Sequence, residues 1–566
     1  MTGSTSLAHG MLASARLPTG AAGRARGAPR RKRSWSCALP GSGLRPHALR
    51  KARMSAQKQD RAGLEPKSLG QWCRRPPPRE PLRRGTGLEL SARAPRAAAG
   101  ARLGLRSPTT HPFHCLEEVF LRAILAVLTL VTLPLLAPAQ TTPFLTDDEV
   151  RMLANEISGD RAFEHIRWLS HWHRDSGMEG YFKAAEYVVK AAREAGLQDV
   201  RFIEQKLPGP NYTAREAELR IVEPVDLKLA DRGDHAVFLA DGSHSADVTA
   251  ELVWIGDASD QALKGREVAG KIVLTSAHPA FAARQAVWGK GAAGVVSFYS
   301  GGRGDDYPDQ VAWGRIPIDP PDGKKGTFAF MLSRRKGLAL RALLESSGEQ
   351  EILGTGRRAP GGRILVRARV RTEIGRAPGR TGFVEGWIRG TGRRDQQIVI
   401  TAHLQEEQGS ANDDGSGCGS VLEIARALNR LIATGRIPRP KRDIRFWWTD
   451  EIYSEYRWFR DHPDEPARML ANLHQDMTGA NQAIGSRVQH LILPPHSRTS
   501  WLDTLFESLG TWLIETNNAY LAAGLQNSQP RPFSRPIVAA RGSRQGYNAR
   551  FVPYFDSSDH MCFVEG

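Results

Sequence analysis

The sequence of 566 residues predicts an α/β fold, with a mixed, mainly parallel sheet flanked by helices and a β-rich domain inserted into it. Three observations predict this fold. From Phe383 onward, apolar strand-like runs alternate with amphipathic helices, which is typical of α/β sheets. Two helical patterns precede these runs. Between Glu216 and Thr372 the pattern changes to short β-like runs broken by Gly, Pro and Asp.

The basic charge of the chain is confined to its N-terminal end. The formal net charge is +18, but residues 1–115 hold 23 Lys and Arg against 4 Asp and Glu, which leaves 55 against 56 for the rest. Residues 1–118 are rich in Arg, Pro, Ala and Gly without a periodic apolar pattern, so we expect this segment to be disordered. A basic nucleic-acid-binding arm is the alternative for this segment. The remaining residues have a net charge of −1, which does not indicate a nucleic-acid partner.

Residues 119–139 have the pattern of a secretory signal peptide. Arg122 precedes about fourteen mostly apolar residues, and Ala137-Pro138-Ala139 supplies the small-x-small pattern of a cleavage site. Because such a signal belongs at an N-terminus, we expect translation to start near Val119 or Leu121 and the preceding stretch to be an over-extended reading frame. The expected product is exported, either secreted or periplasmic, without a stable membrane span, since the apolar run is short for one. A retained N-terminal anchor is the alternative.

Residues 140–215 are expected to form the first part of the larger domain. Apolar residues at helical spacing predict helices within residues 160–172 and 179–195, and Gly196 stands where a C-cap glycine would end the second helix. A strand over residues 200–207 follows.

Residues 216–372 are expected to form the inserted β-rich domain. Residues 268–278 predict a turn into a buried strand, and residues 283–300 predict a helix, a glycine turn and another buried strand. The succession of Gly-Lys-Ile-Val-Leu and Gly-Ala-Ala-Gly-Val-Val resembles a protease-associated domain, a small β-rich insert of secreted peptidases.

Residues 373–566 are expected to complete the larger domain. Residues 383–403 predict a pair of strands, and the second contains an apolar run expected for a strand that is buried on both faces. Residues 417–435 predict an amphipathic helix. Its apolar face holds Val421, Ile424, Leu428 and Leu431. Two further strands are expected within residues 442–451 and 471–479.

Histidines and acidic residues gather where these strands end. His403, Asp450, Glu451 and Asp476 follow strands, Asp413 and Asp414 precede a helix, and His560 follows Asp559. In α/β sheets, ligands bind beyond the carboxyl ends of the strands. Two imidazoles with several carboxylates suit a first-row metal such as zinc. Each residue alone is more often a cap, turn or surface residue, but their joint pattern predicts a metal site.

The motifs in this order resemble those of the family-28 metallopeptidases. They are "AHLQ…ANDDGSG…EIAR", "FWWTDE", "NLHQDMTG" and "SDHMCF", and the resemblance covers about Arg161 to Gly566. The family contains co-catalytic-zinc aminopeptidases, and its relatives include glutamate carboxypeptidases, glutaminyl cyclases and the transferrin receptor. The resemblance therefore implies a secreted zinc-dependent aminopeptidase that hydrolyses the N-terminal peptide bond of peptide substrates.

The resemblance also implies a role for each site residue. Asp413 would bridge two zinc ions, with His403 and Asp476 completing one site and Glu451 and His560 the other. Asp450 would be the general base, and Asp414 would form the cis peptide that family members place after the bridging aspartate. Two Zn²⁺, three carboxylates and a bridging hydroxide then sum to zero charge, which favours deprotonation of the bound water near neutral pH.

The chain departs from the family pattern at several positions. Gln405 stands where the family usually has an aspartate that orients the first histidine, and Asp450 stands where it usually has glutamate. Tyr453 and Tyr456 lie where glycines are usual, and we expect them to reshape the pocket. The chain ends at Gly566, where relatives continue with another strand and helix, so we expect a truncated C-terminus.

Two other classes of function stay open at this point. One is a non-catalytic binding protein on the same fold, against which the retained ligand set argues. The other is a glutaminyl cyclase or carboxypeptidase. The insert weighs against a cyclase, and no basic residues can be located that would hold a substrate carboxylate. The sequence leaves open the side-chain preference, the physiological substrate, the oligomeric state and the pairing of Cys418 with Cys562.

Overall fold

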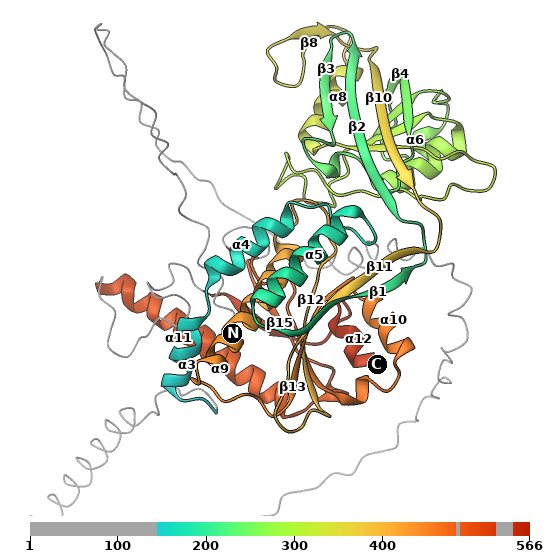
Figure 1. The fold of residues 1–566 in the computed structure, drawn as a ribbon. Coiled ribbons are helices and arrows are strands. Elements are labelled where there is room, and N and C mark those ends of the chain that lie inside the picture. The colour runs from blue at the N-terminus through green and yellow to red at the C-terminus, as the bar shows by residue number, and fades with distance from the viewer. Residues whose placement is uncertain (1–143, 483–486, 528–546, 566) are drawn as a thin grey trace, which may run out of the picture. The chain divides into compact units, whose positions relative to one another are not determined.

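The structure is a computed structural model that describes residues 144–482, 487–527 and 547–565 (Figure 1). The expected disordered segment, residues 1–118, and the expected signal peptide, residues 119–139, lie outside the described residues. Among the helices that are described, none has the length and apolar character that crossing a bilayer requires.

The larger domain is built on a five-stranded mixed sheet. Its strands are β1 (Gln198–Leu207), β11 (Gly379–Ile388), β12 (Gln397–His403), β13 (Asp443–Thr449) and β14 (Met469–His474). Their order in the sheet is β1-β11-β13-β12-β14. β12 is parallel to β13 and to β14, whereas the β1–β11 and β11–β13 pairs are antiparallel. The three parallel strands are therefore neighbours, and their carboxyl ends lie at one edge of the sheet.

Helices cover both faces of this sheet (Figure 1). The helices of this domain are α3 (Asp147–Glu156), α4 (Gly159–Ser170), α5 (Glu179–Glu194), α9 (Gly417–Ala433), α10 (Tyr453–Asp461), α11 (Trp501–Asn527) and α12 (His560–Glu565), of which α4, α5 and α9 cover one face and α10 and α12 the other. One core joins α5 and α9 to Phe446 and Trp448 of β13. Another joins α10 and α12 to Trp447 of the same strand. Alternate residues of β13 thus enter opposite cores, so this strand is buried on both faces.

Residues 383–403 contain two strands, as predicted, but the two do not pair with each other. β13 lies between β11 and β12, antiparallel to the first and parallel to the second. The reason is topological. A parallel neighbour needs a crossover connection, and the amphipathic helix α9 supplies it between β12 and β13.

Two local predictions for the helices are confirmed. α5 ends at Glu194, and Gly196 has a φ of 84°, the left-handed conformation in which glycine carries no steric penalty. The amide of Leu197 donates to the carbonyl of Ala192, which closes the helix end. In α9, the predicted apolar face packs on the sheet, with Val421 and Leu431 fully buried.

The insert forms a seven-stranded sheet of its own. In sheet order its strands are β3 (Leu227–Asp231), β2 (Tyr212–Glu223), β10 (Leu365–Ile374), β4 (Ala246–Trp254), β5 (Ile272–Thr275), β6 (Gly294–Ser297) and β7 (Ala329–Met331). Its helices include α6 (Asp260–Leu263), α7 (Pro279–Ala282) and α8 (Arg334–Glu345). Along the chain these strands run from Tyr212 to Ile374. The predicted boundaries at residues 216 and 372 therefore fall inside β2 and β10. The resemblance to a protease-associated domain stays a prediction.

In the described part, two small sheets accompany the two larger ones. β15 (Gln489–Ile492) and β16 (Ala549–Val552) form a two-stranded parallel sheet, and β8 (Glu349–Glu351) pairs with β9 (Arg358–Pro360). Cys418 and Cys562 are both buried and free, and they belong to the cores on opposite faces of the five-stranded sheet. The two cysteines therefore do not form a disulfide.

Candidate metal centre

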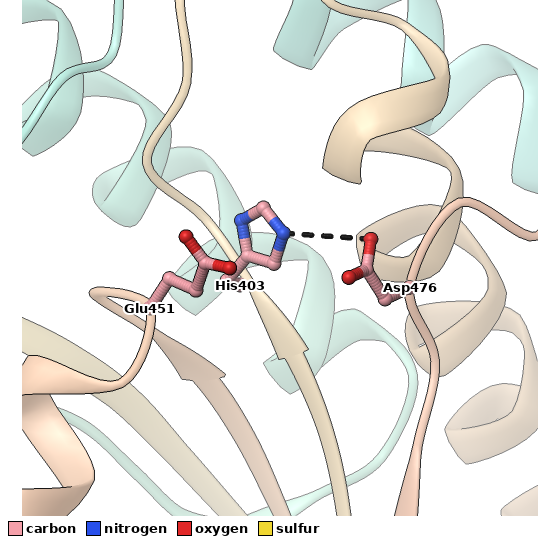
Figure 2. Close-up of side chains that lie close together, drawn as sticks. All are labelled: His403, Glu451 and Asp476. Atoms are coloured by element: carbon pink, nitrogen blue, oxygen red, sulfur yellow. Dashed lines mark ion pairs between the residues drawn. The ribbon is translucent and has the colours of Figure 1, made fainter. Parts of the chain in front are cut away.

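Three of the predicted ligands come together at the carboxyl ends of the parallel strands. His403 is the last residue of β12, Glu451 lies two residues after β13 and Asp476 two residues after β14. Figure 2 shows the His403 imidazole between the two carboxylates. Ligand atoms of these three residues all lie within 4.8 Å of one another. The apolar runs of the strands set this arrangement. Each strand reaches the same edge of the sheet, and its polar residue lies there.

The ring of His403 has a donor atom with no hydrogen-bonding partner. His403 is 1% exposed, and its Nε2 atom is buried and unpartnered. Nε2 lies 3.2 Å from Oδ1 of Asp413 and 3.5 Å from Oδ1 of Asp476. Two ligands of one tetrahedral zinc lie about 3.4 Å apart, since each is about 2.0–2.2 Å from the ion. The spacing of these atoms therefore fits a zinc ion.

The charges around His403 also favour a cation. Burial alone lowers the pKa of His403, but the carboxylates of Glu451, Asp413 and Asp476 outweigh burial and raise the pKa well above its ordinary value. The pKa of Asp476 is lowered because the attraction of His403 outweighs the opposing effect of burial. A site that stabilises positive charge on the imidazole stabilises a metal ion in the same place, and metal binding there would release a proton.

Asp413 and Asp414 have different surroundings although they are adjacent. The peptide bond between them is cis, as the resemblance implies. The Asp413 side chain is 44% exposed and faces Nε2 of His403. Asp414 is fully buried and accepts hydrogen bonds from the amides of His403, Gly417 and Met477. Asp414 thus ties the end of β12, the start of α9 and the loop after β14 together, while Asp413 faces the site.

Gln405 does not orient the His403 ring with its side chain. Nδ1 of His403 lies 3.4 Å from the backbone carbonyl of Gln405. The Gln405 side chain instead holds Glu451. Its Oε1 accepts from the Glu451 amide at 2.8 Å, and its Nε2 donates to Oε2 of Glu451 at 3.4 Å. The Gln405 side chain therefore supports the Glu451 carboxylate with a donated hydrogen bond. An ionised aspartate at this position has no donor and could not make that bond.

Glu406 is a carboxylate at the site to which sequence reasoning assigned no role. Among the described residues, a second group of possible metal ligands consists of His403, Glu406 and Asp413, again within 4.8 Å of one another. Glu406 is 3% exposed. Burial first, and the negative charge of Asp413 second, raise its pKa well above its ordinary value. Its position three residues after a histidine that ends a strand was the signal available in the sequence.

Asp450 lies beside Glu451 in sequence, but its carboxylate has other partners. Oδ1 accepts a hydrogen bond from Ser176, and Oδ2 accepts from Thr381 at 3.0 Å. Arg457 forms an ion pair with Oδ2 at 3.2 Å. Asp450 belongs to neither of the two ligand groups of the described residues. Its role as general base stays a prediction.

His560 lies at the start of α12, outside both ligand groups of the described chain. Its Nε2 donates to the carbonyl of Phe555 at 3.1 Å. The preceding residue, Asp559, is fully buried and accepts from the hydroxyl of Thr449 and the amide of Ile452. Asp559 therefore fastens the start of α12 to the end of β13. The prediction that His560 is a metal ligand stays a prediction.

The comparison with protein families agrees with this geometry. Residues 384–486 match the model of peptidase family M28. The match includes His403, Asp413, Glu451 and Asp476, and it confirms the prediction of a metallopeptidase, whose substrates are peptides. His560 lies outside the matched M28 residues.

Solved structures that resemble this chain include other peptidases. An aminopeptidase from Aneurinibacillus sp. strain AM-1 is 18% identical, with a TM-score of 0.39 over 74% of this chain and 84% of that chain. A zinc aminopeptidase from Bacillus subtilis is 18% identical, with a TM-score of 0.41 over 69% and 84%. A glutaminyl cyclase from Macrostomum lignano is 11% identical, with a TM-score of 0.31 over 76% and 81%. No curated protein matches the chain. At these identities and TM-scores the similarities do not assign an activity within family M28.

Proposed function

We propose that the protein is an exported, zinc-dependent aminopeptidase with two zinc ions per chain. The observation that carries the proposal is the buried, unpartnered Nε2 of His403 with two carboxylate oxygens at the spacing of zinc ligands. This arrangement lies within the residues that match family M28. Nε2 makes no hydrogen bond of good geometry to either carboxylate, and a bound ion at this place would satisfy the nitrogen and both oxygens together.

The proposed ligands divide between two ions. His403 and Asp476 hold one ion, Glu451 and His560 hold the other, and Asp413 is shared. Bound zinc would polarise the scissile carbonyl and lower the pKa of water, which supplies a nucleophile at neutral pH. Gln405 keeps the Glu451 carboxylate in place, and Asp414 keeps Asp413 at the start of α9.

Asp450 is proposed as the group that carries a proton from the attacking water to the leaving amine. Its place directly before Glu451, after the end of β13, supports this proposal. Transfer of a proton to Oδ2 requires Thr381 or Arg457 to move away from that oxygen. General base catalysis of this kind contributes roughly 10²–10⁴-fold in rate.

The arginines of the site weigh against a substrate that is held by a free C-terminus. Among the described residues, the two arginines that contact the site already have partners. Arg174 donates to the carbonyls of Leu169, Glu407 and Ser410, and Arg457 pairs with Asp450. Neither is therefore positioned to bind a substrate carboxylate.

Metal analysis and a substrate panel test the proposed function. We expect two zinc ions per chain, hydrolysis of amino-acid anilides, no cleavage of N-blocked peptides, and loss of activity with a chelator that added Zn²⁺ restores. Cyclisation of glutaminyl peptides, or removal of C-terminal residues from N-blocked peptides, would instead assign one of the other two reactions. A protein that binds no metal and turns over none of these substrates would be a binding protein.

Export is proposed from the sequence of residues 119–139, and we predict that the mature chain begins near Gln140. The physical reason is the small-x-small pattern before Gln140, which signal peptidases cleave. N-terminal sequencing of protein collected from the medium or periplasm checks the prediction. An N-terminus that still carries the Arg-rich segment would contradict it.

A further inference from the structure

We propose that Glu406 supplies a carboxylate ligand to the metal centre. The proposal deepens the function proposed above and rests on it. Ligand atoms of Glu406, His403 and Asp413 lie within 4.8 Å of one another. Carboxylate oxygen and imidazole nitrogen are zinc ligands of the same class as those already assigned to the site.

The backbone holds Glu406 in this position. The Arg174 amide donates to the Glu406 carbonyl at 2.8 Å, and the Glu406 amide donates to the Arg174 carbonyl at 3.2 Å. The buried Arg174 guanidinium also donates to the carbonyls of Glu407 and Ser410, further along the same loop. The loop after β12 is thus fixed at Glu406 and at the residues that follow it. A ligand must be held in this way to bind a metal with defined geometry.

A second observation points to a ligand in the same place. Nε2 of His403 is buried and unpartnered, and it faces Asp413, the other member of the Glu406 group. His560, the remaining histidine of the expected ligand set, donates its Nε2 hydrogen to Phe555 and lies in neither group of the described residues. Glu406 therefore offers an oxygen close to His403, where the structure does not bring the second histidine.

Glu406 and Asp413 bring two carboxylates close to His403. Glu406 is 3% exposed, and ligand atoms of the three residues lie within 4.8 Å of one another. A divalent cation between the two carboxylates would turn the repulsion between like charges into attraction.

The exchange of Glu406 for glutamine tests the proposal by metal binding rather than by activity. The wild type, Glu406→Gln and the control Glu345→Gln, a half-exposed glutamate on α8 that belongs to neither ligand group of the described residues, are freed of metal with a chelator and titrated with Zn²⁺ by calorimetry. Loss of groups that merely support ligands costs about 10–100-fold in metal affinity. We therefore expect Glu406→Gln to bind at least one zinc tenfold or more weakly, and Glu345→Gln to bind as the wild type does. Cobalt-loaded Glu406→Gln should show a changed visible absorption spectrum.

The outcomes separate this inference from the proposed function. If the wild type binds no zinc, the proposed function fails. If the wild type binds zinc, and the zinc affinity of Glu406→Gln is within twofold of the wild-type affinity with the same cobalt spectrum, Glu406 is not a ligand. A rise in KM alone, with normal zinc affinity, would overturn the proposal in the same way and assign Glu406 to substrate binding. Should Glu406→Gln fail to fold, Glu406→Asp keeps the charge, and its changed cobalt spectrum is the expected result.

Discussion

Asp413→Ala is expected to remove both zinc ions and all peptidase activity. Asp413 is the only ligand that the two ions share in the proposed centre, and its Oδ1 lies 3.2 Å from Nε2 of His403. Its side chain is 44% exposed, so the shorter alanine leaves no buried cavity and the protein should stay folded. Metal content after dialysis, with circular dichroism as a check on folding, measures the result.

Two comparisons sharpen this prediction. His403→Ala should mainly weaken the ion that it shares with Asp476, so at least one zinc should remain. Asp461→Ala removes an exposed aspartate at the end of α10 that pairs with Arg460 and belongs to neither ligand group of the described residues, so it should change neither metal content nor activity. If Asp413→Ala retained two zinc ions per chain, Asp413 would not be the shared ligand, and the assignment carried over from the family would be wrong at that position.

The sequence predicted that several candidate ligands lie together, because this depends on strand ends, while their role as metal ligands stays a prediction. His403, Glu451 and Asp476 each follow an apolar run, and neighbouring parallel strands bring such ends together whatever the loops do. The order of the strands was harder to predict. Whether β12 pairs with β11 or with β13 depends on where α9 packs, and this is set by contacts that are distant in sequence.

The loop after β12 shows what the sequence could not predict. Residues of a loop have no periodic pattern that tells which side chain faces the site. Gln405 and Glu406 are adjacent, yet one supports Glu451 and the other faces His403 and Asp413. Arg174 lies shortly after α4, 236 residues before Ser410 in the sequence, and it holds this conformation. Only the folded chain brings these residues together.

Asp450 is buried among polar partners. Asp450 is 1% exposed, and its carboxylate has Ser176, Thr381 and Arg457 as partners. Aspartate is also one methylene shorter than the glutamate usual at this position, and a misplacement of about 1 Å can cost about a hundredfold in rate. Two interpretations therefore compete. Asp450 is either the proton carrier, moving between Arg457 and the site, or the counter-charge that lets Arg457 be buried.

Asp450→Asn is expected to lower kcat at least about a hundredfold with both zinc ions retained. Asparagine keeps the shape but cannot accept the proton, and its amide nitrogen cannot accept the hydrogen bonds that one carboxylate oxygen accepts. The variant should also be less stable, because Arg457, with a side chain only 13% exposed, loses its counter-charge. Breaking a buried pair on one side costs about 3–5 kcal/mol. A fall in kcat could therefore follow from disorder around Arg457 rather than from lost proton transfer.

The double variant Asp450→Asn, Arg457→Gln separates these causes. Both charges are then gone, so most of the lost stability should return, and coupling between the two residues can be measured from the double-mutant cycle. If Asp450 carries the proton, kcat should stay at least about a hundredfold below the wild type although stability recovers. Recovery of kcat together with stability would mean that Asp450 only neutralises Arg457. The base would then be another residue at the site, because the charge of Asp450 would serve the fold and not the reaction.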